Sequence, residues 1–278
     1  LGLPLSKVRV SATDTSKVAN TSATAASTGS DLNGKAAQDA ARQIRERLQN
    51  FLAQRHAIEA ELIAFAGGMV SWGDQKLGFA DVVMQAYTAR VQLWSDGYYA
   101  TPGLHWDRNT MQGKPFFYFA YGAALSEVVM DTLTGEYRVL ATDILHDVGT
   151  SLNPALDIGQ IEGGFIQGMG WMTCEELWWH PSNGRLMTHA PSTYKIPTAN
   201  DAPPHLRVTL FDQANRADTI HRSKAVGEPP ILLSFSVWLA LRDAVRAARS
   251  GPLSPTEPLG VPATPEAVYR AIRANAST

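Results

Sequence analysis

Cysteine is almost absent from this 278-residue sequence, which contains only Cys174. A single thiol cannot form an internal disulfide framework. It also cannot supply the paired ligands of a structural zinc site or the ligand set of an iron–sulfur cluster. The fold therefore has to rest on a hydrophobic core, and the lack of disulfides favours a reducing, cytoplasmic setting.

Charge excess and long apolar runs are also missing. The formal net charge is −2 and the basic residues are scattered, so nothing favours a nucleic acid or a membrane surface as a partner. No run is long enough to span a bilayer, and no signal peptide is visible. The chain begins without Met, as if cut from something longer.

No P-loop, GxGxxG, GxSxG or zinc-ligand pattern occurs. Composition alone indicates a soluble globular protein of one large domain or two subdomains.

The most informative segment covers residues 221–249. Polar residues 221–224 lead into the small residues 225–227, and Glu228 follows, directly before two prolines. Pro229 should favour an extended backbone at Glu228 and begin a helix that reaches about Arg249. Because the first half of this helix is apolar nearly all round, we expect it to be buried. Glu228 then either complements the helix dipole or serves as a functional carboxylate.

Residues 13–31 are rich in Ser, Thr, Ala and Gly. This composition is typical of a flexible loop. Small hydroxyl residues and exposed backbone N–H groups are also what an anionic phosphate or pterin group needs at close range. Composition leaves both interpretations open.

A second unusual segment is a glycine-rich helix, predicted from Asn153-Pro154 to about Leu177. Five interior glycines should weaken it by roughly 1 kcal/mol each relative to Ala, so something has to require them. Tight packing of another backbone and the approach of a cofactor are equally suited to explain them. The glycines are Gly159, Gly163, Gly164, Gly168 and Gly170, and the apolar stripe is Ile158, Ile161, Phe165, Met169 and Met172.

Periodicity and turn residues predict the remaining elements. His146 and Asp147 could suggest a catalytic pair, but adjacent strand residues point to opposite faces, which argues against it. The predicted elements are a strand Leu5–Ala12, a helix 32–54 capped by Asp31, a hairpin near 66–74, a helix 79–91, a hairpin of strands 116–130 and 137–148, a strand 206–211, and a helix from Thr264 to about Ala274.

Four segments together resemble one enzyme family. They are KAVGEPPILLSFSVWLALRDAVRAAR (224–249), TSATAASTGSDLNG (21–34), TDILHDVGTSLNPALDIGQIEGGFIQGMG (142–170) and THAPSTYKIP (188–197). They are similar to the molybdenum hydroxylases, specifically xanthine dehydrogenase/oxidase and its aldehyde oxidase relatives, over roughly residues 8–50 and 97–272. The resemblance implies an α+β fold with mixed β-sheets and packed helices. Residues 1–278 would then form the C-terminal portion of the molybdopterin-binding region.

The resemblance also implies roles for individual residues. Glu228 matches the general base of the GEPP segment, Gln160 matches a glutamine that hydrogen-bonds the pterin, and Ala26 matches an alanine packed against the molybdenum. Gly29 departs from relatives that carry a hydroxyl residue there. No side chain is expected to ligate the metal. The full set expected at the cofactor is Ala26, Ser27, Thr28, Gln160, Lys224, Ala225, Val226 and Gly227, with Glu228 as the catalytic residue.

The implied activity is oxidation of xanthine or hypoxanthine to urate with oxygen derived from water, in cytoplasmic purine catabolism. The cofactor would be molybdenum–molybdopterin, with iron–sulfur clusters and FAD on other domains or subunits. The expected partners are an upstream molybdopterin-domain segment and an iron–sulfur/FAD subunit, in a homo- or hetero-oligomer, and this chain alone should be inactive. The alternatives are an aldehyde or other N-heterocycle hydroxylase of the same family, or a non-catalytic fragment that scaffolds partner chains.

Overall fold

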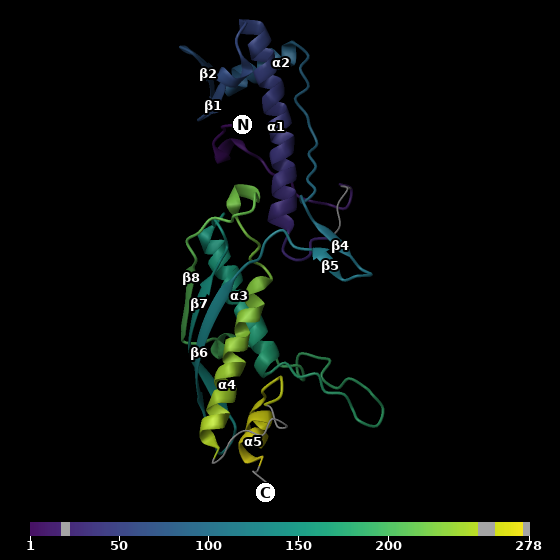
Figure 1. Ribbon diagram of the computed structural model, residues 1–278, viewed down its shortest axis with the longest axis vertical. Coiled ribbons are helices and arrows are strands. Elements are labelled where there is room, and N and C mark those ends of the chain that lie inside the picture. Colours follow the sequence, from purple (N-terminus) through teal and green to yellow (C-terminus); the bar gives the residue numbers. More distant parts are fainter. Residues whose placement is uncertain (18–22, 250–258, 275–278) are drawn as a thin grey trace. The chain divides into compact units, whose positions relative to one another are not determined.

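The computed structural model describes residues 1–17, 23–249 and 259–274 (Figure 1). The chain divides into two compact units, Leu1–Lys114 and Pro115–Thr278. Within the described residues, no helix combines the length and apolar character needed to cross a membrane.

The N-terminal unit is built on one long helix and a small antiparallel sheet of order β1-β2-β3. Its core is formed by Leu48, Leu52, Ile63, Phe65, Val70, Trp72, Val82 and Ala86, so the predicted amphipathic helices and the hairpin near 66–74 are confirmed. The elements are η1 (Leu5–Lys7), α1 (Gly29–His56), η2 (Ala60–Leu62), β1 (Ala64–Ala66), β2 (Met69–Trp72), β3 (Gln75–Gly78), α2 (Phe79–Thr88), β4 (His105–Asp107) and β5 (Gln112–Lys114).

Two local predictions in this unit are wrong. Leu5–Ala12 is no strand but a 3₁₀ turn followed by irregular chain, and Val10 is 89% exposed. An alternating pattern gives a strand only where a partner strand and a core face are available. The long helix begins at Gly29, with Thr28 at the N-cap, so Asp31 lies in its first turn. There its charge complements the helix dipole without acting as the cap.

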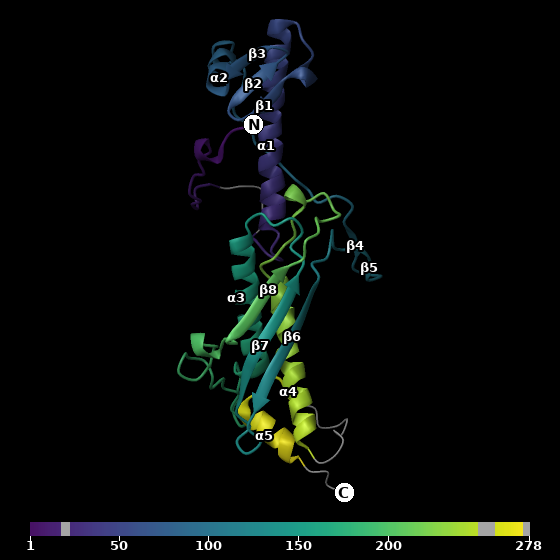
Figure 2. The same ribbon diagram turned by 90° about the vertical axis from the view of Figure 1, so that its left-hand side faces the viewer.

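The C-terminal unit has a sheet of order β6-β7-β8, antiparallel between β6 and β7 and parallel between β7 and β8. Helices α3 and α4 pack side by side on one face of this sheet (Figures 1 and 2). The elements are β6 (Gly122–Met130), β7 (Tyr137–His146), α3 (Pro154–Thr173), η3 (Ala199–Asp201), β8 (His205–Leu210), η4 (Ile220–Arg222), η5 (Pro229–Ser234), α4 (Phe235–Ala248) and α5 (Pro265–Arg273).

The predicted helix starts at Asn153-Pro154 and at Thr264 are confirmed in this unit. The Asn153 side chain accepts the Leu156 N–H at the start of α3, and Thr264 accepts the Ala267 N–H at the start of α5. Both residues fill the role that short polar side chains have before a helix. The α3 stripe is buried where it meets the sheet and α4, in a core of Val139, Ile144, Val148, Ile161, Phe165, Met169, Val237, Leu241, Val245, Leu259, Ala263 and Val268.

Two further predictions need correction. The strand predicted from Phe116 begins at Gly122. The helix predicted over 229–249 is a 3₁₀ helix for its first six residues and α-helical only from Phe235. Its first half is not buried all round, because Leu232 is 65% exposed and Leu239 42% exposed. Helix α3 and the sheet cover only part of the surface of this segment, so an apolar sequence all round did not ensure burial.

Candidate functional site

Glu228 ends the segment Lys224–Glu228 that leads into η5. Its backbone is helical, with φ −97° and ψ −40°, so the predicted extended backbone is wrong. The reason is local: the Glu228 carbonyl accepts the Ile231 N–H at 3.1 Å and closes the first 3₁₀ turn. The carboxylate is exposed and makes no cap hydrogen bond to η5. In the part of the chain that the structure describes, the carboxylate also has no ion-pair partner.

The start of this segment is tied to the end of β7. The Lys224 N–H donates to the Val148 carbonyl at 2.7 Å, and the Ala225 N–H donates to the Tyr118 hydroxyl at 2.7 Å. Just before it, Gly149 pairs with Ser223 in an isolated antiparallel bridge. These bonds hold the backbone of the segment against the sheet.

The Lys224 side chain points into the protein. Its ammonium lies 2.5 Å from a carboxylate oxygen of Asp147 and donates to the Phe119 carbonyl at 2.9 Å. It also lies 5.4 Å from the centre of the Tyr121 ring. The side chains of Lys224 and Asp147 are only 9% and 10% exposed. Lys224 was expected at the cofactor, and these internal contacts show what its charged end does within this unit.

Asp147 was considered only as a partner of His146, and its role beside Lys224 was missed. One Asp147 oxygen accepts the Gly149 N–H at 2.9 Å, and the other faces Lys224. The neighbouring His146 is buried, its Nδ1 has no hydrogen-bond partner among the described residues, and burial lowers the pKa of its imidazole. A carboxylate at a strand end, two residues before a glycine, is the signal that could have pointed to a structural role.

The other end of the segment is packed against α3. Pro230 is buried, and a Cβ at Gly164 would lie 3.2 Å from the Pro230 Cβ. A Cβ at Gly168 would lie 2.4 Å from both the Ile231 carbonyl oxygen and the Ser234 hydroxyl. Close packing against the η5 backbone therefore requires glycine at Gly168, whereas Gly164 lies in a tight contact with the Pro230 side chain.

The five glycines of α3 thus fall into two groups, those with close neighbours and those without. A Cβ at Gly170 would meet Glu175 and Pro197 at 2.2–2.7 Å, so this position is also a packing position. A Cβ at Gly159 or Gly163 would meet nothing within 4 Å. Packing therefore explains three of the glycines and leaves two on an open side of the helix.

Gln160 is exposed and lies between these two open glycines. It is also one turn from Gly164, on the same face of the helix. A Cβ at Gly164 would lie 3.8 Å from the Gly227 carbonyl oxygen. The fold therefore brings Gln160 into the same region of the C-terminal unit as Glu228.

This region suits an anionic pterin or phosphate group. Within the described residues, the backbone N–H groups of Val226, Gly227 and Glu228 donate to no other residue. Gly227 and Glu228 are exposed, whereas the Val226 side chain packs on the core. Successive free N–H groups and an exposed amide are the donors that such an anion requires.

Ala26, Ser27 and Thr28 lie in the N-terminal unit, directly before α1. Ala26 and Ser27 have positive φ angles of 51° and 53°, which non-glycine residues rarely adopt. The Thr28 hydroxyl donates to the Ala25 carbonyl at 2.9 Å. The N-terminus of this 28-residue helix is the positive end of its dipole, which fits an anion. Their expected contact with the cofactor remains a prediction.

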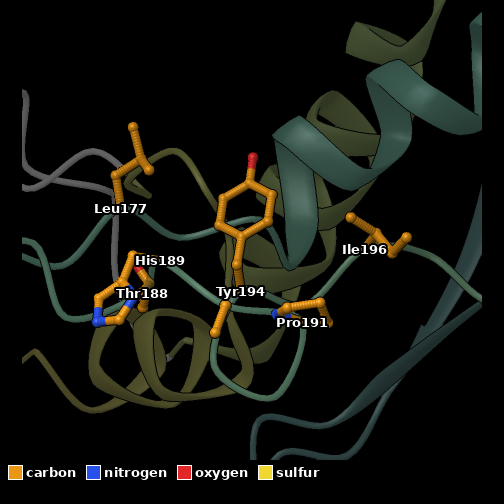
Figure 3. A pocket seen from close by; sticks show the side chains of 7 residues that line it. Leu177, Thr188, His189, Pro191, Tyr194 and Ile196 are labelled. Atoms are coloured by element: carbon orange, nitrogen blue, oxygen red, sulfur yellow. The ribbon is translucent and has the colours of Figure 1, made fainter.

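An apolar cavity of about 430 Å³ lies elsewhere in the C-terminal unit (Figure 3). None of the predicted site residues lines it, and its walls offer few polar groups to orient a ligand. It is lined by Leu177, Thr188, His189, Ala190, Pro191, Tyr194 and Ile196. Among the described residues, no three His, Cys, Asp or Glu side chains are grouped to bind a metal.

Comparisons with known proteins agree on one family. Residues 1–203 match the model of the molybdopterin cofactor-binding domain. The chain is 44% identical over 275 residues to mouse (Mus musculus) xanthine dehydrogenase/oxidase, covering 98% of this chain and 19% of that protein. It is 43% identical over 277 residues to rice (Oryza sativa) xanthine dehydrogenase, covering 97% and 19%. The chain thus spans about a fifth of the length of these relatives.

Solved structures support the same fold. Quinoline 2-oxidoreductase from Pseudomonas putida 86 matches 90% of this chain and 30% of its own, with a TM-score of 0.73 and 24% identity. The Glu228 segment lies beyond the residues that match the family model but within the alignments to the xanthine dehydrogenases. The expected α+β fold is confirmed, and the chain belongs to the molybdopterin cofactor-binding domain family, with xanthine dehydrogenases among its relatives.

Proposed function

We propose that this chain is part of a molybdopterin-dependent hydroxylase that oxidises xanthine or hypoxanthine to urate with oxygen derived from water. The proposal draws on the 44% identity to a xanthine dehydrogenase/oxidase over nearly the whole chain. It places the protein in cytoplasmic purine catabolism. The observation that carries it is the exposed Glu228 carboxylate, held on a fixed backbone in the same region as Gln160.

Glu228 is the proton acceptor in this proposal. A general base has to present a free carboxylate oxygen at a fixed place. Within the described residues the Glu228 carboxylate is engaged by no cation, while Lys224 is occupied by Asp147. The two prolines that follow restrict the backbone and so fix the place from which the Glu228 side chain extends. The carboxylate itself makes no cap hydrogen bond to η5.

Gln160 and the free N–H groups of residues 226–228 would hold the cofactor from the C-terminal unit. Ala26, Ser27 and Thr28, which directly precede α1, stay proposed cofactor-binding residues on the strength of the family resemblance. When bound, the molybdenum cofactor supplies the two-electron redox chemistry. The residues of this chain bind it, orient it and move the proton.

The proposed partners come from the family resemblance, which implies that iron–sulfur clusters, FAD and the upstream part of the cofactor region lie on other domains or subunits. The chain spans only 19% of the xanthine dehydrogenases that it matches, which agrees with this proposal. We therefore propose that this chain alone retains no stable molybdopterin and does not oxidise xanthine. Metal analysis after gel filtration of the chain checks this, and stoichiometric molybdenum would contradict it.

The test of the function is Glu228→Gln in the complete enzyme. The change keeps the size of the side chain and removes the proton acceptor. We expect full molybdenum content and a fall in turnover of at least about 100-fold, the lower end for general-base catalysis. The control is Glu127→Gln, which neutralises an exposed carboxylate on β6.

The decisive comparison uses several substrates. Xanthine, hypoxanthine, an aldehyde and quinoline assayed in parallel separate the proposed substrate from the alternatives within the family. Near-normal turnover of Glu228→Gln with full molybdenum would make Glu228 a helix-end carboxylate. Lack of turnover with every substrate in the loaded wild-type enzyme would favour the scaffold interpretation.

A further inference from the structure

The Glu228 segment is fixed at two points. At its far end, Pro230 is buried against Gly164 of α3. At its near end, the Lys224 backbone is bonded to Val148, and its side chain runs inward to Asp147. Between these points Gly227 and Glu228 are exposed. The carboxylate therefore sits on a short bridge whose ends are both anchored.

The near anchor is unusual because it is charged and nearly buried. With side chains 9% and 10% exposed, Lys224 and Asp147 have lost most of their hydration. Each group makes one further hydrogen bond, because Lys224 donates to the Phe119 carbonyl and Asp147 accepts from the Gly149 N–H. A buried pair of this kind is weak evidence for added stability, since apolar residues of similar size would often serve as well.

What such a pair does provide is fixed geometry. The ammonium bonds a side chain at the end of β7 and a carbonyl in the chain before β6, so it joins three separate stretches of backbone. The turn before Lys224 also has an uncommon backbone, because His221 and Arg222 have positive φ angles of 47° and 62°. Surrounding bonds hold this turn, because the Thr219 hydroxyl and the Asn215 amide both donate to the Ser223 carbonyl.

We propose that Asp147 and Lys224 are positioning residues for Glu228: their buried ion pair sets where the segment 224–228 begins, and hence where the carboxylate lies. The catalytic part of this inference rests on the function proposed above. The pair touches neither substrate nor cofactor in this proposal. Lys224 acts through the backbone that it anchors.

The test compares two aspartates of the same stretch of chain in the complete enzyme. Asp147→Asn breaks the buried pair. Asp143→Asn breaks the ion pair with Arg207 on the outer face of the sheet, where the side chains are 48% and 66% exposed, and it is the matched control. The double variant Asp147→Asn/Lys224→Met removes both charges, so that no buried charge is left unpaired.

The first measurement is amide hydrogen exchange at Lys224 and Ala225, whose N–H groups are bonded in the native fold. We expect exchange there to be at least about tenfold faster in Asp147→Asn and in the double variant, with α5 unchanged, because local opening exposes only the freed segment. Asp143→Asn should stay within about twofold of wild type.

The second measurement is turnover per bound molybdenum. We expect kcat to fall at least about tenfold with KM changed less than about threefold, in the single and in the double variant, because the acceptor is displaced while binding residues remain. A double variant with wild-type exchange at Lys224 and Ala225 and wild-type turnover would show that the pair matters only for charge balance, and would overturn the inference. Unchanged exchange at Lys224 and Ala225 in both variants would do the same.

These results are separable from the test of Glu228 itself. If Glu228→Gln keeps full turnover, the proposed function fails, while the exchange data still decide whether the pair holds the segment. If Asp147→Asn does not fold, the double variant supplies both measurements.

Discussion

Replacing Gly168 by Ala tests the packing of α3 on η5 most directly. The added Cβ would lie 2.4 Å from the Ile231 carbonyl oxygen and 2.4 Å from the Ser234 hydroxyl. The hydroxyl could rotate, but it would then lose its 2.7 Å bond to the Ile231 carbonyl. The carbonyl belongs to the backbone of η5, so α3 and η5 would have to move apart.

The size of the effect follows from three terms. Overpacking of a tight contact costs roughly 1–3 kcal/mol, and the backbone clash puts Gly168→Ala in the upper part of that range. Loss of the Ser234 bond adds about 1 kcal/mol. The better helix propensity of Ala returns about 1 kcal/mol. We expect a net loss of about 2 kcal/mol in the free energy of unfolding.

Gly163→Ala is the matched control on the same helix. A Cβ there meets nothing within 4 Å, so only the propensity term remains. This variant should gain roughly 0.5–1 kcal/mol. The two substitutions are chemically identical, and their midpoints should differ by roughly 5–12 °C, at about 2–4 °C per kcal/mol for a unit of this size.

The assay is urea or thermal unfolding followed by circular dichroism and tryptophan fluorescence. The expected order of stability is Gly163→Ala above wild type above Gly168→Ala. If Gly168→Ala equals or exceeds the wild type, the close approach of η5 to α3 is wrong. The second anchor of the Glu228 segment would then be lost as well.

Two further changes probe the surroundings of Glu228. Gln160→Ala should lower the molybdopterin content of the complete enzyme while its unfolding midpoint changes little, because the side chain is exposed. Loss of cofactor together with a clear fall in the unfolding midpoint would favour a packing role. The pKa of His146 is lowered by burial, so the unfolded chain takes up the proton first, and the protein should lose stability as the pH falls below the ordinary value of 6.5. His146→Leu should abolish this slope between about pH 7.5 and about pH 5, whereas an unchanged slope would assign it to other groups.

Local patterns were enough for several elements. The helix starts at Asn153 and Thr264, the hairpin of β6 and β7 and the apolar stripe of α3 rest on short-range rules, and the structure confirms them. Elements that depend on a partner were predicted less well. Residues 5–12 alternate but form no strand, and residues 116–121 lie outside the ladder that begins at Gly122.

By itself, the sequence determined the family, the general fold and the identity of the candidate base. The GEPP segment with Glu228 is one continuous stretch of sequence, and the glycine-rich helix is another. No structure was needed to find either of them. Only the tertiary structure decided which glycines are packing positions. Gly168 faces η5 and Gly163 faces open space, although both sit in the same helix with similar neighbours.

The same holds for the support of the site. Asp147 and Lys224 are 77 residues apart, and no local rule connects them. Their pairing depends on the end of β7 meeting the turn before Glu228. It also depends on burial, which removes most of the water that would otherwise solvate each charge. Periodicity and propensity act over a few residues, whereas burial and ion pairing depend on which distant segments the fold brings together.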